Sequence, residues 1–396
     1  MDRGLRLLHV LPSIAPETGG PSFSVSMMCQ ALAQAGNEVS LFTTDWPRKM
    51  DFLQIPEKRV ERNITIHLFP TRRNYLVGHL PDSPKLIEAL HAAARNFDFV
   101  LVHSLWNPIA TYAAKTLRHL GMTYGIMDHG MLDPLVLRRN PWKKIPWMYL
   151  YERENIRKAR LLVFSSEKGK RKALCSGLTF QRTFIFPHII DVASWKDLPP
   201  RWVFEELFPQ VRGREIILFV GRINWVKNLD QLILAFRLLK SNYPKAMLVL
   251  AGPDNEGYKR KLIDQAKTLA VAGDLLFTGM LDRENLKSAY SRADVFALIS
   301  QKENFGLSLA EALAWGIPSV ISEGVDIGST LGNEKCLCVV KPDSSEIASA
   351  LEAMLERSAR VGVPDPEARA LAEREWGRPK VWELLQTYRE ILGRSS

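Results

Sequence analysis

The feature that most constrains the fold is a regular alternation of short apolar runs with segments whose apolar residues recur at helical spacing. Leu5 to Leu11 is a continuous apolar run, Phe23 to Ala35 has the helical spacing and stops at Gly36, and Glu38 to Thr43 alternates as a strand. Further strands are predicted at Ile64 to Phe69, Phe97 to Val102, Thr123 to Met127, Leu161 to Phe164 and Thr183 to Phe186. Repeated strand and helix units favour a mostly parallel sheet.

The same alternation restarts after Pro199-Pro200. Strands are predicted at Ile216 to Val220, Met247 to Ala251, Leu275 to Thr278, Val295 to Ile299, Ser319 to Ile321 and Leu337 to Val340, with helices at 229–241, 257–271, 284–291, 306–315 and 344–357. We therefore expect an α/β protein with two doubly wound, Rossmann-like domains, 1–198 and 199–375, and a cleft between them. The Pro-rich stretch from Phe186 to Arg201 is the expected linker.

Length and composition agree with this architecture. A chain of 396 residues suits two domains of about 150 to 200 residues, and 46% hydrophobic with 24% charged residues is ordinary for a globular protein. No stretch approaches the ~18 apolar residues of a membrane-spanning helix, and the first residues lead straight into a strand pattern, so we expect a cytoplasmic location. The four cysteines are too scattered for a disulfide framework and are expected to be reduced thiols.

The net charge of +10 is concentrated in one segment, 138–172, where twelve cations face three acids. Trp142, Trp147, Tyr149 and Tyr151 are interleaved with these charges. Basic residues beside aromatic ones are typical of surfaces that dock on anionic lipid, which would place the protein peripherally on the inner face of a membrane. The alternative is a solvated basic face with ordinary core aromatics. Nucleic acid is not an expected partner, because no recognised nucleic-acid module accompanies the charge.

Two cations follow the apolar run from Glu215 to Val220. Arg222 and Lys227 would lie beyond the carboxyl end of this strand, where open α/β sheets bind ligands. An Arg fork with a Lys point charge can neutralise a diphosphate without a metal ion, and the chain has no Asp-x-Asp triplet. We therefore expect no metal and no cofactor. Asn228 is predicted to cap the following helix, with Gln231 reaching back to it.

Two acids, Glu303 and Glu311, are eight positions apart near the predicted helix 306–315. If the whole interval were helical, their carboxylates would be about 12 Å apart along the axis, too far to share one atom. The two acids would hold separate parts of an extended ligand. Together with the cations, they indicate a ligand with a negative end and a hydroxyl-rich end.

The first domain offers weaker candidates. Gly19 and Gly20 precede a helix amino terminus, where backbone amides can approach an anion. The chain lacks both the Gly-x-Gly-x-x-Gly fingerprint after its first strand and a P-loop, which disfavours oxidoreductases and nucleoside triphosphatases. His129 and His103 each follow a predicted strand and would line the cleft; neither is part of a nucleophile elbow.

At this point the motifs resemble a known family. The sequence from Glu303 to Pro318, preceded by Gly-Arg-x-x-x-x-Lys at 221–227, is similar to the retaining, nucleotide-sugar-dependent glycosyltransferases of the group 1 / family 4 type, which have the GT-B fold. Gly19-Gly20, Asp128-His129-Gly130 and the segment Pro187 to Asp191 match further parts of the family pattern. Trp376 to Leu392 resembles the helix that, in this fold, crosses back to the first domain.

The resemblance implies roles for the matched positions. Arg222 and Lys227 would hold the donor diphosphate, Glu303 the hydroxyls of the transferred sugar, and Glu311 the nucleotide ribose. The loop containing Asn304, Phe305, Gly306 and Leu307 would bind the donor, its last three residues through backbone amides at a helix start; His129 would lie by the donor sugar, and Gly19-Gly20 by the phosphates. The chain departs from the family at Gly324 to Ser329, where Gly-Gly-x-Pro-Glu is usual, and at 187–191.

The expected function is therefore retaining transfer of a hexose from a nucleoside-diphosphate sugar to an acceptor hydroxyl. A lipid-linked saccharide in cell-surface polysaccharide biosynthesis is one expected acceptor, since the basic segment belongs to the domain that handles acceptors in this fold. The alternatives are a small soluble acceptor and a catalytically silent subunit that binds nucleotide sugar.

Overall fold

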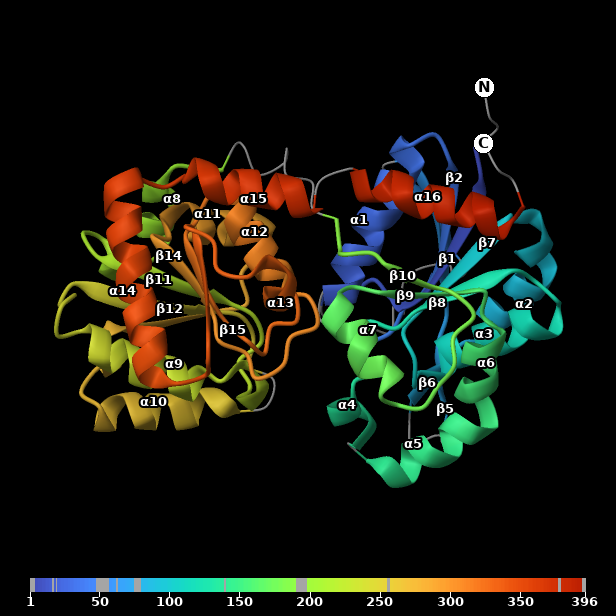
Figure 1. The fold of residues 1–396 in the computed structure, drawn as a ribbon, viewed down its shortest axis with the longest axis horizontal. Helices are drawn as coiled ribbons and strands as arrows, with labels where there is room; N and C mark the ends of the chain where they lie inside the picture. The colour runs from blue at the N-terminus through green and yellow to red at the C-terminus, as the bar shows by residue number, and fades with distance from the viewer. Residues whose placement is uncertain are drawn as a thin grey trace. The chain divides into compact units, whose positions relative to one another are not determined.

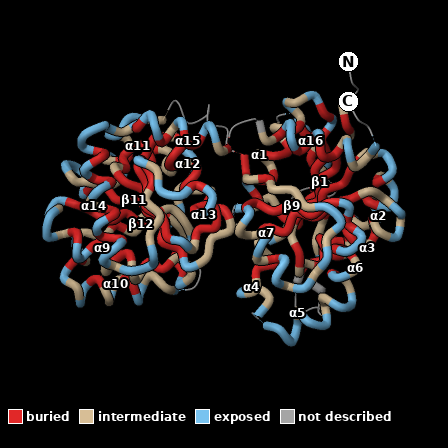
Figure 2. Tube along the Cα trace, viewed as in Figure 1, coloured by how far each residue is buried: buried red, intermediate tan, exposed pale blue. Residues whose placement is uncertain are grey.

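The chain folds into two compact units (Figure 1). The structure is a computed structural model that describes residues 4–15, 18, 20–47, 57–61, 63–74, 80–138, 140–189, 198–254, 257–376 and 379–393. Unit 1 comprises Met1–Ile189 and Arg378–Ser396, and unit 2 comprises Ile190–Gly377. The central strands of both units are buried, whereas the outer sides of the helices are exposed (Figure 2).

Unit 1 is built on an eight-stranded sheet in the order β10-β9-β8-β7-β1-β2-β4-β3. Its strands are β1 (Arg6–Ser13), β2 (Glu38–Thr44), β3 (Glu57–Glu61), β4 (Ile64–Phe69), β7 (Phe99–His103), β8 (Tyr124–Met127), β9 (Leu161–Phe164) and β10 (Thr183–Ile185). Neighbouring strands are parallel except β3, which pairs antiparallel with β4 at one edge. A separate hairpin joins β5 (Arg72–Asn74) to β6 (Leu80–Asp82). The strand order reverses between β1 and β7, which makes this the topological switch point of the sheet.

Helices cover both faces of this sheet. They are α1 (Gly20–Gln34), α2 (Pro84–Ala93), α3 (Pro108–His119), α4 (Pro134–Arg138), α5 (Pro141–Trp147), α6 (Arg153–Lys158), α7 (Glu167–Leu174) and α16 (Pro379–Ile391), with a 3-10 turn η3 (Ala94–Asn96) and a π-helical turn η4 (Met148–Glu152). One core cluster joins the sheet to α2, α3 and α6, and the other joins it to α1 and α16. In the second cluster, Tyr388 of α16 stacks on Phe99 with ring centroids 4.4 Å apart.

Unit 2 is built on a six-stranded parallel sheet in the order β13-β12-β11-β14-β15-β16. Its strands are β11 (Glu215–Val220), β12 (Ala246–Ala251), β13 (Leu275–Gly279), β14 (Val295–Leu298), β15 (Ser319–Ser322) and β16 (Leu337–Val340). Its helices are α8 (Arg201–Leu207), α9 (Leu229–Leu239), α10 (Tyr258–Thr268), α11 (Arg283–Arg292), α12 (Leu307–Trp315), α13 (Gly328–Leu331), α14 (Ser344–Val361) and α15 (Pro366–Trp376), with 3-10 turns η6 (Pro209–Val211), η7 (Trp225–Lys227) and η8 (Ala272–Asp274). The switch point here lies between β11 and β14.

The strands predicted from apolar runs are present, and their ends differ from the predictions by at most two residues. Three features differ. Asn228 has a left-handed conformation (φ 56°) and makes no side-chain cap, so the predicted capping box of α9 is wrong. Helices α8, α13 and α15 and strands β3, β5 and β6 were not predicted. The segment that resembled a closing helix contains the end of α15 at Trp376 followed by α16, which belongs to unit 1.

Candidate functional site

The switch point of unit 2 brings two loops together. One loop follows β11 and carries Arg222 and Lys227; the other follows β14 and carries Glu303. Ligands of open α/β sheets bind beyond the carboxyl ends of the strands at such a point, because the chain leaves the two strands in opposite directions and opens a crevice. The topology therefore places both motifs at the position where a ligand is expected.

Lys227 and Glu303 form an ion pair between these loops, from Nζ to Oε2, and both side chains are mostly buried. The backbones are joined beside it: the amide of Gln301 donates to the carbonyl of Val226 at 2.8 Å, and Nε2 of Gln301 donates to Oδ1 of Asn228 at 3.3 Å. Asn228 thus links the two loops instead of capping a helix. This network fixes the cation and the carboxylate in one place.

Arg222 lies on the same turn as Lys227 but is exposed. Within the residues that the structure describes, its side chain has no hydrogen-bond or ion-pair partner. The turn itself is held tightly, since a Cβ on Gly252 would lie 2.0 Å from the carbonyl oxygen of Gly221. A guanidinium without a partner in the described part of the chain, on a rigid turn beside a lysine, is available for a phosphate.

Glu303 is held on both sides by the loop after β15. Its amide donates to the carbonyl of Gly324 at 2.9 Å, and its own carbonyl accepts from the amide of Asp326 at 2.8 Å. This loop is the segment that departs from the family pattern. A Cβ on Gly324 would lie 2.2 Å from the carbonyl oxygen of Ser300, so only glycine permits the loop to approach so closely. The supporting role of this loop was not predicted from the sequence.

The residues after Glu303 form a tight turn into α12. Phe305 is buried and packs edge-on against Trp376, with ring centroids 5.8 Å apart, while Asn304, between Glu303 and Phe305 in sequence, is half-buried. Gly306 has a left-handed conformation (φ 84°), and a Cβ there would lie 3.6 Å from Cγ of Glu303. Leu307 begins the helix. The amino terminus of α12, with its partial positive charge, therefore follows directly after the Glu303 loop.

Glu311 lies on α12 and has a different partner from Glu303. The hydroxyl of Tyr290 on α11 donates to its Oε2 at 2.8 Å. Burial raises the pKa of Glu311 to about 7, although the Tyr290 hydrogen bond and the charge of Arg283 act in the opposite direction. The carboxyl therefore titrates near neutral pH.

In unit 1, the predicted residues lie beside the switch point of its own sheet. Gly20 begins α1, and a Cβ there would meet no atom within 4 Å among the described residues, so the position has room for a side chain. Gly19 lies outside the described residues. His129 follows β8 in a left-handed conformation (φ 50°) and is buried.

His129 belongs to a row of four buried histidines. His9 of β1 contacts His103 of β7 (Nδ1 to Nε2, 2.9 Å), and His103 contacts His129 (Nδ1 to Nε2, 3.1 Å). The ring of His188 stacks on that of His129, with centroids 5.6 Å apart and planes 10° apart. Burial lowers the pKa of His9 to about 3 and that of His188 to about 4, and it lowers the pKa values of the other two. His9 and His188 were missed because each stands alone in an apolar stretch.

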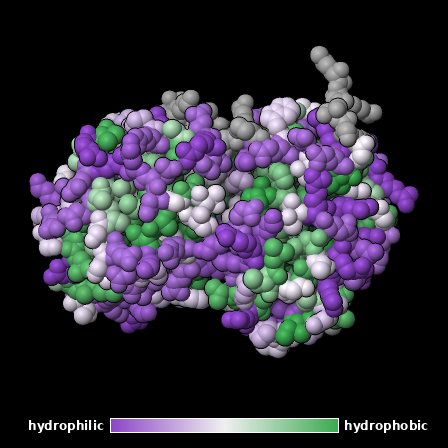
Figure 3. All heavy atoms as spheres, viewed as in Figure 1, coloured by the Kyte–Doolittle hydropathy of each residue, from purple (hydrophilic) through white to green (hydrophobic). Residues whose placement is uncertain are grey.

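The basic segment of unit 1 has an apolar exposed side. More than half of the residue surface is exposed at Trp142, Ile145, Tyr149 and Leu150, and also at Leu135 just before the segment. In Figure 3, hydrophobic atoms lie among hydrophilic ones at the edge of unit 1 where Figure 1 places α5. The opposite side is anchored by the buried carboxylate of Glu152, which accepts hydrogen bonds from the amide of Trp106 (3.0 Å), the hydroxyl of Thr111 (2.6 Å) and Nε1 of Trp147 (3.3 Å).

Among these aromatic residues, Trp142 and Tyr149 therefore do not belong to the core. Nζ of Lys143 lies 4.7 Å from the ring centroid of Trp142, and the guanidinium of Arg153 lies 5.8 Å from that of Tyr149. Trp147 and Tyr151 instead pack against each other, with centroids 4.9 Å apart. In the parts of the chain that the structure describes, no helix combines the length and apolar character needed to cross a bilayer.

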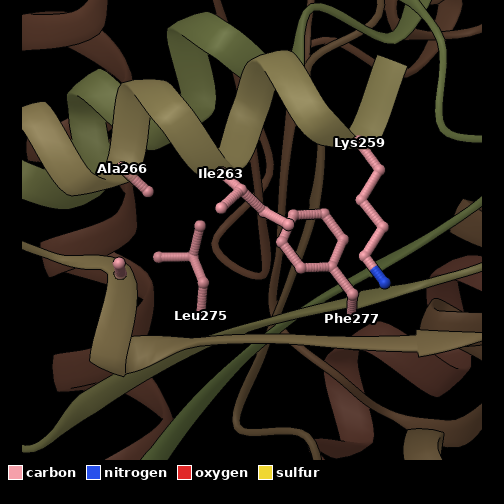
Figure 4. Close-up of a pocket in the computed structure, with 6 residues that line it drawn as sticks. Lys259, Ile263, Ala266, Leu275 and Phe277 are labelled. Carbon is pink, nitrogen blue, oxygen red and sulfur yellow. The ribbon is translucent and has the colours of Figure 1, made fainter. Parts of the chain in front are cut away.

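Two further observations concern a cavity and metal binding. A cavity of about 300 Å³ between α10 and β13, at the edge of the unit 2 sheet, is lined by Lys259, Ile263, Ala266, Ala272, Leu275 and Phe277 (Figure 4). None of the predicted site residues lines it. Over the described ranges, no three side chains of His, Cys, Asp or Glu are grouped so that they could hold a metal ion.

Comparisons with known proteins cover both units. The family "Glycosyl transferases group 1" matches residues 204–373, and "Glycosyltransferase Family 4" matches residues 18–194. Glycogen synthase of Mycobacterium tuberculosis is 34% identical over 158 residues, which are 39% of this chain and 37% of the relative. Alpha-monoglucosyldiacylglycerol synthase of Streptococcus pneumoniae is 30% identical over 163 residues, 41% and 35% of the two chains. These alignments thus span little more than a third of each relative. GDP-mannose-dependent alpha-mannosyltransferase of Mycolicibacterium smegmatis is 25% identical over 99% of both chains.

Solved structures agree in fold over nearly the whole chain. Sucrose-phosphate synthase from Thermosynechococcus elongatus has a TM-score of 0.77 at 19% identity, covering 98% of this chain and 100% of that one. HepE of Anabaena, in complex with UDP and glucose, has a TM-score of 0.72 at 17% identity, covering 97% and 99%. The expected GT-B fold, with two parallel-sheet α/β domains, is confirmed.

Proposed function

The chain belongs to the group 1 / family 4 glycosyltransferases, and on this premise we propose that it transfers a hexose from a nucleoside-diphosphate sugar to an acceptor hydroxyl, with retention of configuration and without a metal ion. The observation that carries the proposal is the Lys227 and Glu303 ion pair at the switch point between β11 and β14. Charged groups of both signs, held together at one switch point, match a donor with an anionic and a hydroxyl-rich part.

Each charged group has one task in this proposal. Arg222, which has no partner among the described residues, and Lys227 bind the diphosphate. Glu303 accepts hydrogen bonds from hydroxyls of the transferred sugar, and Glu311 from the ribose. The amides around Phe305, Gly306 and Leu307 add positive potential at the start of α12. The family resemblance assigns His129, Gly19 and Gly20 to donor binding as well.

The chemistry follows from these charges. Breaking the bond to the anomeric carbon builds positive charge on the sugar ring and negative charge on the departing diphosphate. Arg222 and Lys227 stabilise the negative charge on the diphosphate as it develops. Stabilisation of developing charge by fixed groups is usually the largest single contribution to catalysis. The leaving phosphate oxygen accepts the proton of the incoming hydroxyl, so the acceptor attacks from the same face and configuration is retained.

The test is turnover of the double variant Arg222→Ala, Lys227→Ala. Removing a preorganised charge stabiliser costs roughly 10²- to 10³-fold in rate, so transfer should fall by at least that factor. A double variant that keeps turnover within a factor of a few would refute the assignment. The donor is first identified by thermal shift with UDP-, GDP-, ADP- and dTDP-sugars, because a ligand at 100 times its dissociation constant adds about 2.7 kcal/mol of stability.

The acceptor proposed here is a lipid-linked saccharide at an anionic membrane surface, as in polysaccharide assembly on the inner face of the membrane. The support is the exposed side of 135–150, where Trp142 and Tyr149 lie beside Lys143 and Arg153. The similar Streptococcus pneumoniae enzyme is named for a glucosyldiacylglycerol, which is a lipid. Liposome sedimentation at low salt tests it: stronger binding to anionic than to neutral vesicles is expected, and equal binding would favour a soluble acceptor.

A further inference from the structure

The histidine row of unit 1 restricts how protons can be placed on it. A neutral imidazole carries one N–H, so it donates through one ring nitrogen and accepts through the other. Both nitrogens of His103 are used: Nε2 contacts Nδ1 of His9 and Nδ1 contacts Nε2 of His129. Each of these contacts needs one proton between two nitrogens. With two protons between the nitrogens, the two N–H groups would clash. With no proton there, two lone pairs would face each other.

These requirements couple the three rings. If His129 carries its proton on Nε2, it donates to Nδ1 of His103; His103 then carries its proton on Nε2 and donates to Nδ1 of His9, which must carry its own proton on Nε2. The reverse order puts every proton on Nδ1. All three rings therefore have the same tautomer, so the protonated nitrogen of His129 is coupled to the tautomers of His9 and His103.

The far end of the row decides between the two orders. Nδ1 of His129 is buried and has no hydrogen-bond partner within the described residues. With protons on Nδ1, this atom would be a buried N–H without an acceptor, whereas with protons on Nε2 it is an unshared lone pair. Orphaned buried donors are rarer in proteins than under-used acceptors, which favours the second arrangement.

We propose that His9 and His103 are positioning residues that hold His129 in the Nε2–H tautomer, so that its Nδ1 is a fixed acceptor for a hydroxyl of the ligand. The geometry of the row carries this inference, because the three rings come from β1, β7 and the turn after β8, which are adjacent in the sheet. That this acceptor meets a hydroxyl of a bound sugar rests on the proposed function, and because Nδ1 is buried in this structure, ligand binding must expose it. The stacked ring of His188 limits rotation of His129 about its side chain.

The first test needs no ligand. Nitrogen-15 NMR of the full chain labelled at histidine distinguishes the two tautomers through two-bond couplings between ring nitrogens and ring protons. His9, His103 and His129 are expected to carry their protons on Nε2 in the free protein at neutral pH. A proton on Nδ1 of any of the three would overturn the inference. Because no transfer is measured, this result does not depend on the proposed function.

The second test uses a matched pair of variants at His103. Asparagine places its amide where Nδ1 stands, so His103→Asn keeps an acceptor for His129 and loses the contact with His9. Glutamine places its amide where Nε2 stands, so His103→Gln keeps the contact with His9 and leaves His129 without a partner. We expect His103→Gln to lower kcat by about tenfold or more, with two tautomers of His129 in its spectrum. His103→Asn should retain a single tautomer and more of the activity.

The pattern across the pair separates positioning from simple structural damage. If the two variants lose kcat equally while melting at the wild-type temperature, His103 does not act through His129 and the inference fails. If both variants unfold, the inference is tested by the tautomers of the wild-type protein alone. A wild-type protein with the expected tautomers but no transfer of any sugar would contradict the proposed function and leave the positioning of His129 intact.

Discussion

Lys227 and Glu303, 76 positions apart in the sequence, form an ion pair because β11 and β14 are neighbours in the sheet of unit 2. The pair holds both charges in place in the absence of ligand. It also means that each charge is partly neutralised by the other until a donor with its own charges enters.

The variant Glu303→Gln should therefore separate nucleotide binding from transfer. Releasing Lys227 from its partner should leave the affinity for a bare nucleoside diphosphate unchanged or tighten it, whereas kcat for transfer should fall roughly 10²- to 10³-fold. Calorimetry and steady-state kinetics measure the two effects. Asp274→Asn is the matched control, since it removes the partner of Lys240 in the same unit (3.0 Å) away from the loops; it should change neither quantity.

Glu311 should make donor binding depend on pH near neutrality. Its pKa of about 7 means that the carboxylate, which in the proposed function accepts hydrogen bonds from the ribose, is present above this value and is lost as pH falls. Nucleoside diphosphate affinity should rise about tenfold between about pH 6 and about pH 8. Glu311→Gln should remove this dependence. Tyr290→Phe, which deletes a hydrogen bond that lowers the pKa, should move the profile to higher pH; a profile that moves to lower pH would contradict the assigned contact.

The histidine row should make unit 1 sensitive to acid. The pKa values of His9 and His188 are lowered by burial to about 3 and about 4, so the unfolded chain binds protons below about pH 6.5 that the folded unit does not. Stability should be fully present above that pH and fall as pH decreases toward about 4. Melting temperatures measured across this range should fall less steeply for His188→Asn than for the wild type. His91→Asn, at an exposed position, should keep the wild-type slope.

Gly324 should be required for the geometry around Glu303. A methyl group at this position would overlap the carbonyl oxygens of Ser300 (2.2 Å) and Gln301 (2.5 Å), so Gly324→Ala must displace the loop that holds Glu303. Donor binding should weaken by at least tenfold, as measured by calorimetry, while the fold persists. The control Gly273→Ala adds a methyl group where no atom lies within 4 Å. Equal donor affinity in the two variants would exclude this supporting role.

The exposed aromatic residues should determine membrane binding. The double variant Trp142→Ala, Tyr149→Ala should lose most of the binding to anionic vesicles, because it removes the apolar groups that would enter the interface beside Lys143 and Arg153. Trp202→Ala removes a tryptophan of similar exposure (56% against 70% for Trp142) from unit 2 and should bind as the wild type does. Sedimentation with the same vesicles compares the two, and equal losses would contradict a specific surface.

The apolar runs predicted the strands well because buried parallel strands need continuous hydrophobic residues on both faces. The order of those strands cannot be read from such runs. Lys227 and Glu303 meet only because β11 lies next to β14, and His9 meets His103 only because β1 lies next to β7. The sequence indicated that Arg222, Lys227, His103 and His129 follow the carboxyl ends of strands, but not which side chains contact each other.

Local sequence patterns did not predict the role of a residue where a tertiary contact determines it. Asn228 has the side chain and spacing of a helix cap, but its Oδ1 accepts from Gln301 on the neighbouring loop. Gly324 belongs to a segment that departs from the family pattern, yet it is the residue that lets this segment support Glu303. Close backbone approach leaves no signal in one sequence beyond the glycine itself.

The return of α16 to unit 1 has a consequence for synthesis of the protein. Val381, Leu384, Leu385 and Tyr388 complete one of the two cores of that unit. A nascent chain that has only emerged up to Ile189 therefore still lacks one wall of this core. Unit 2, contiguous from Ile190 to Gly377, can fold as soon as it leaves the ribosome, so the part made first should be the last to reach its final stability.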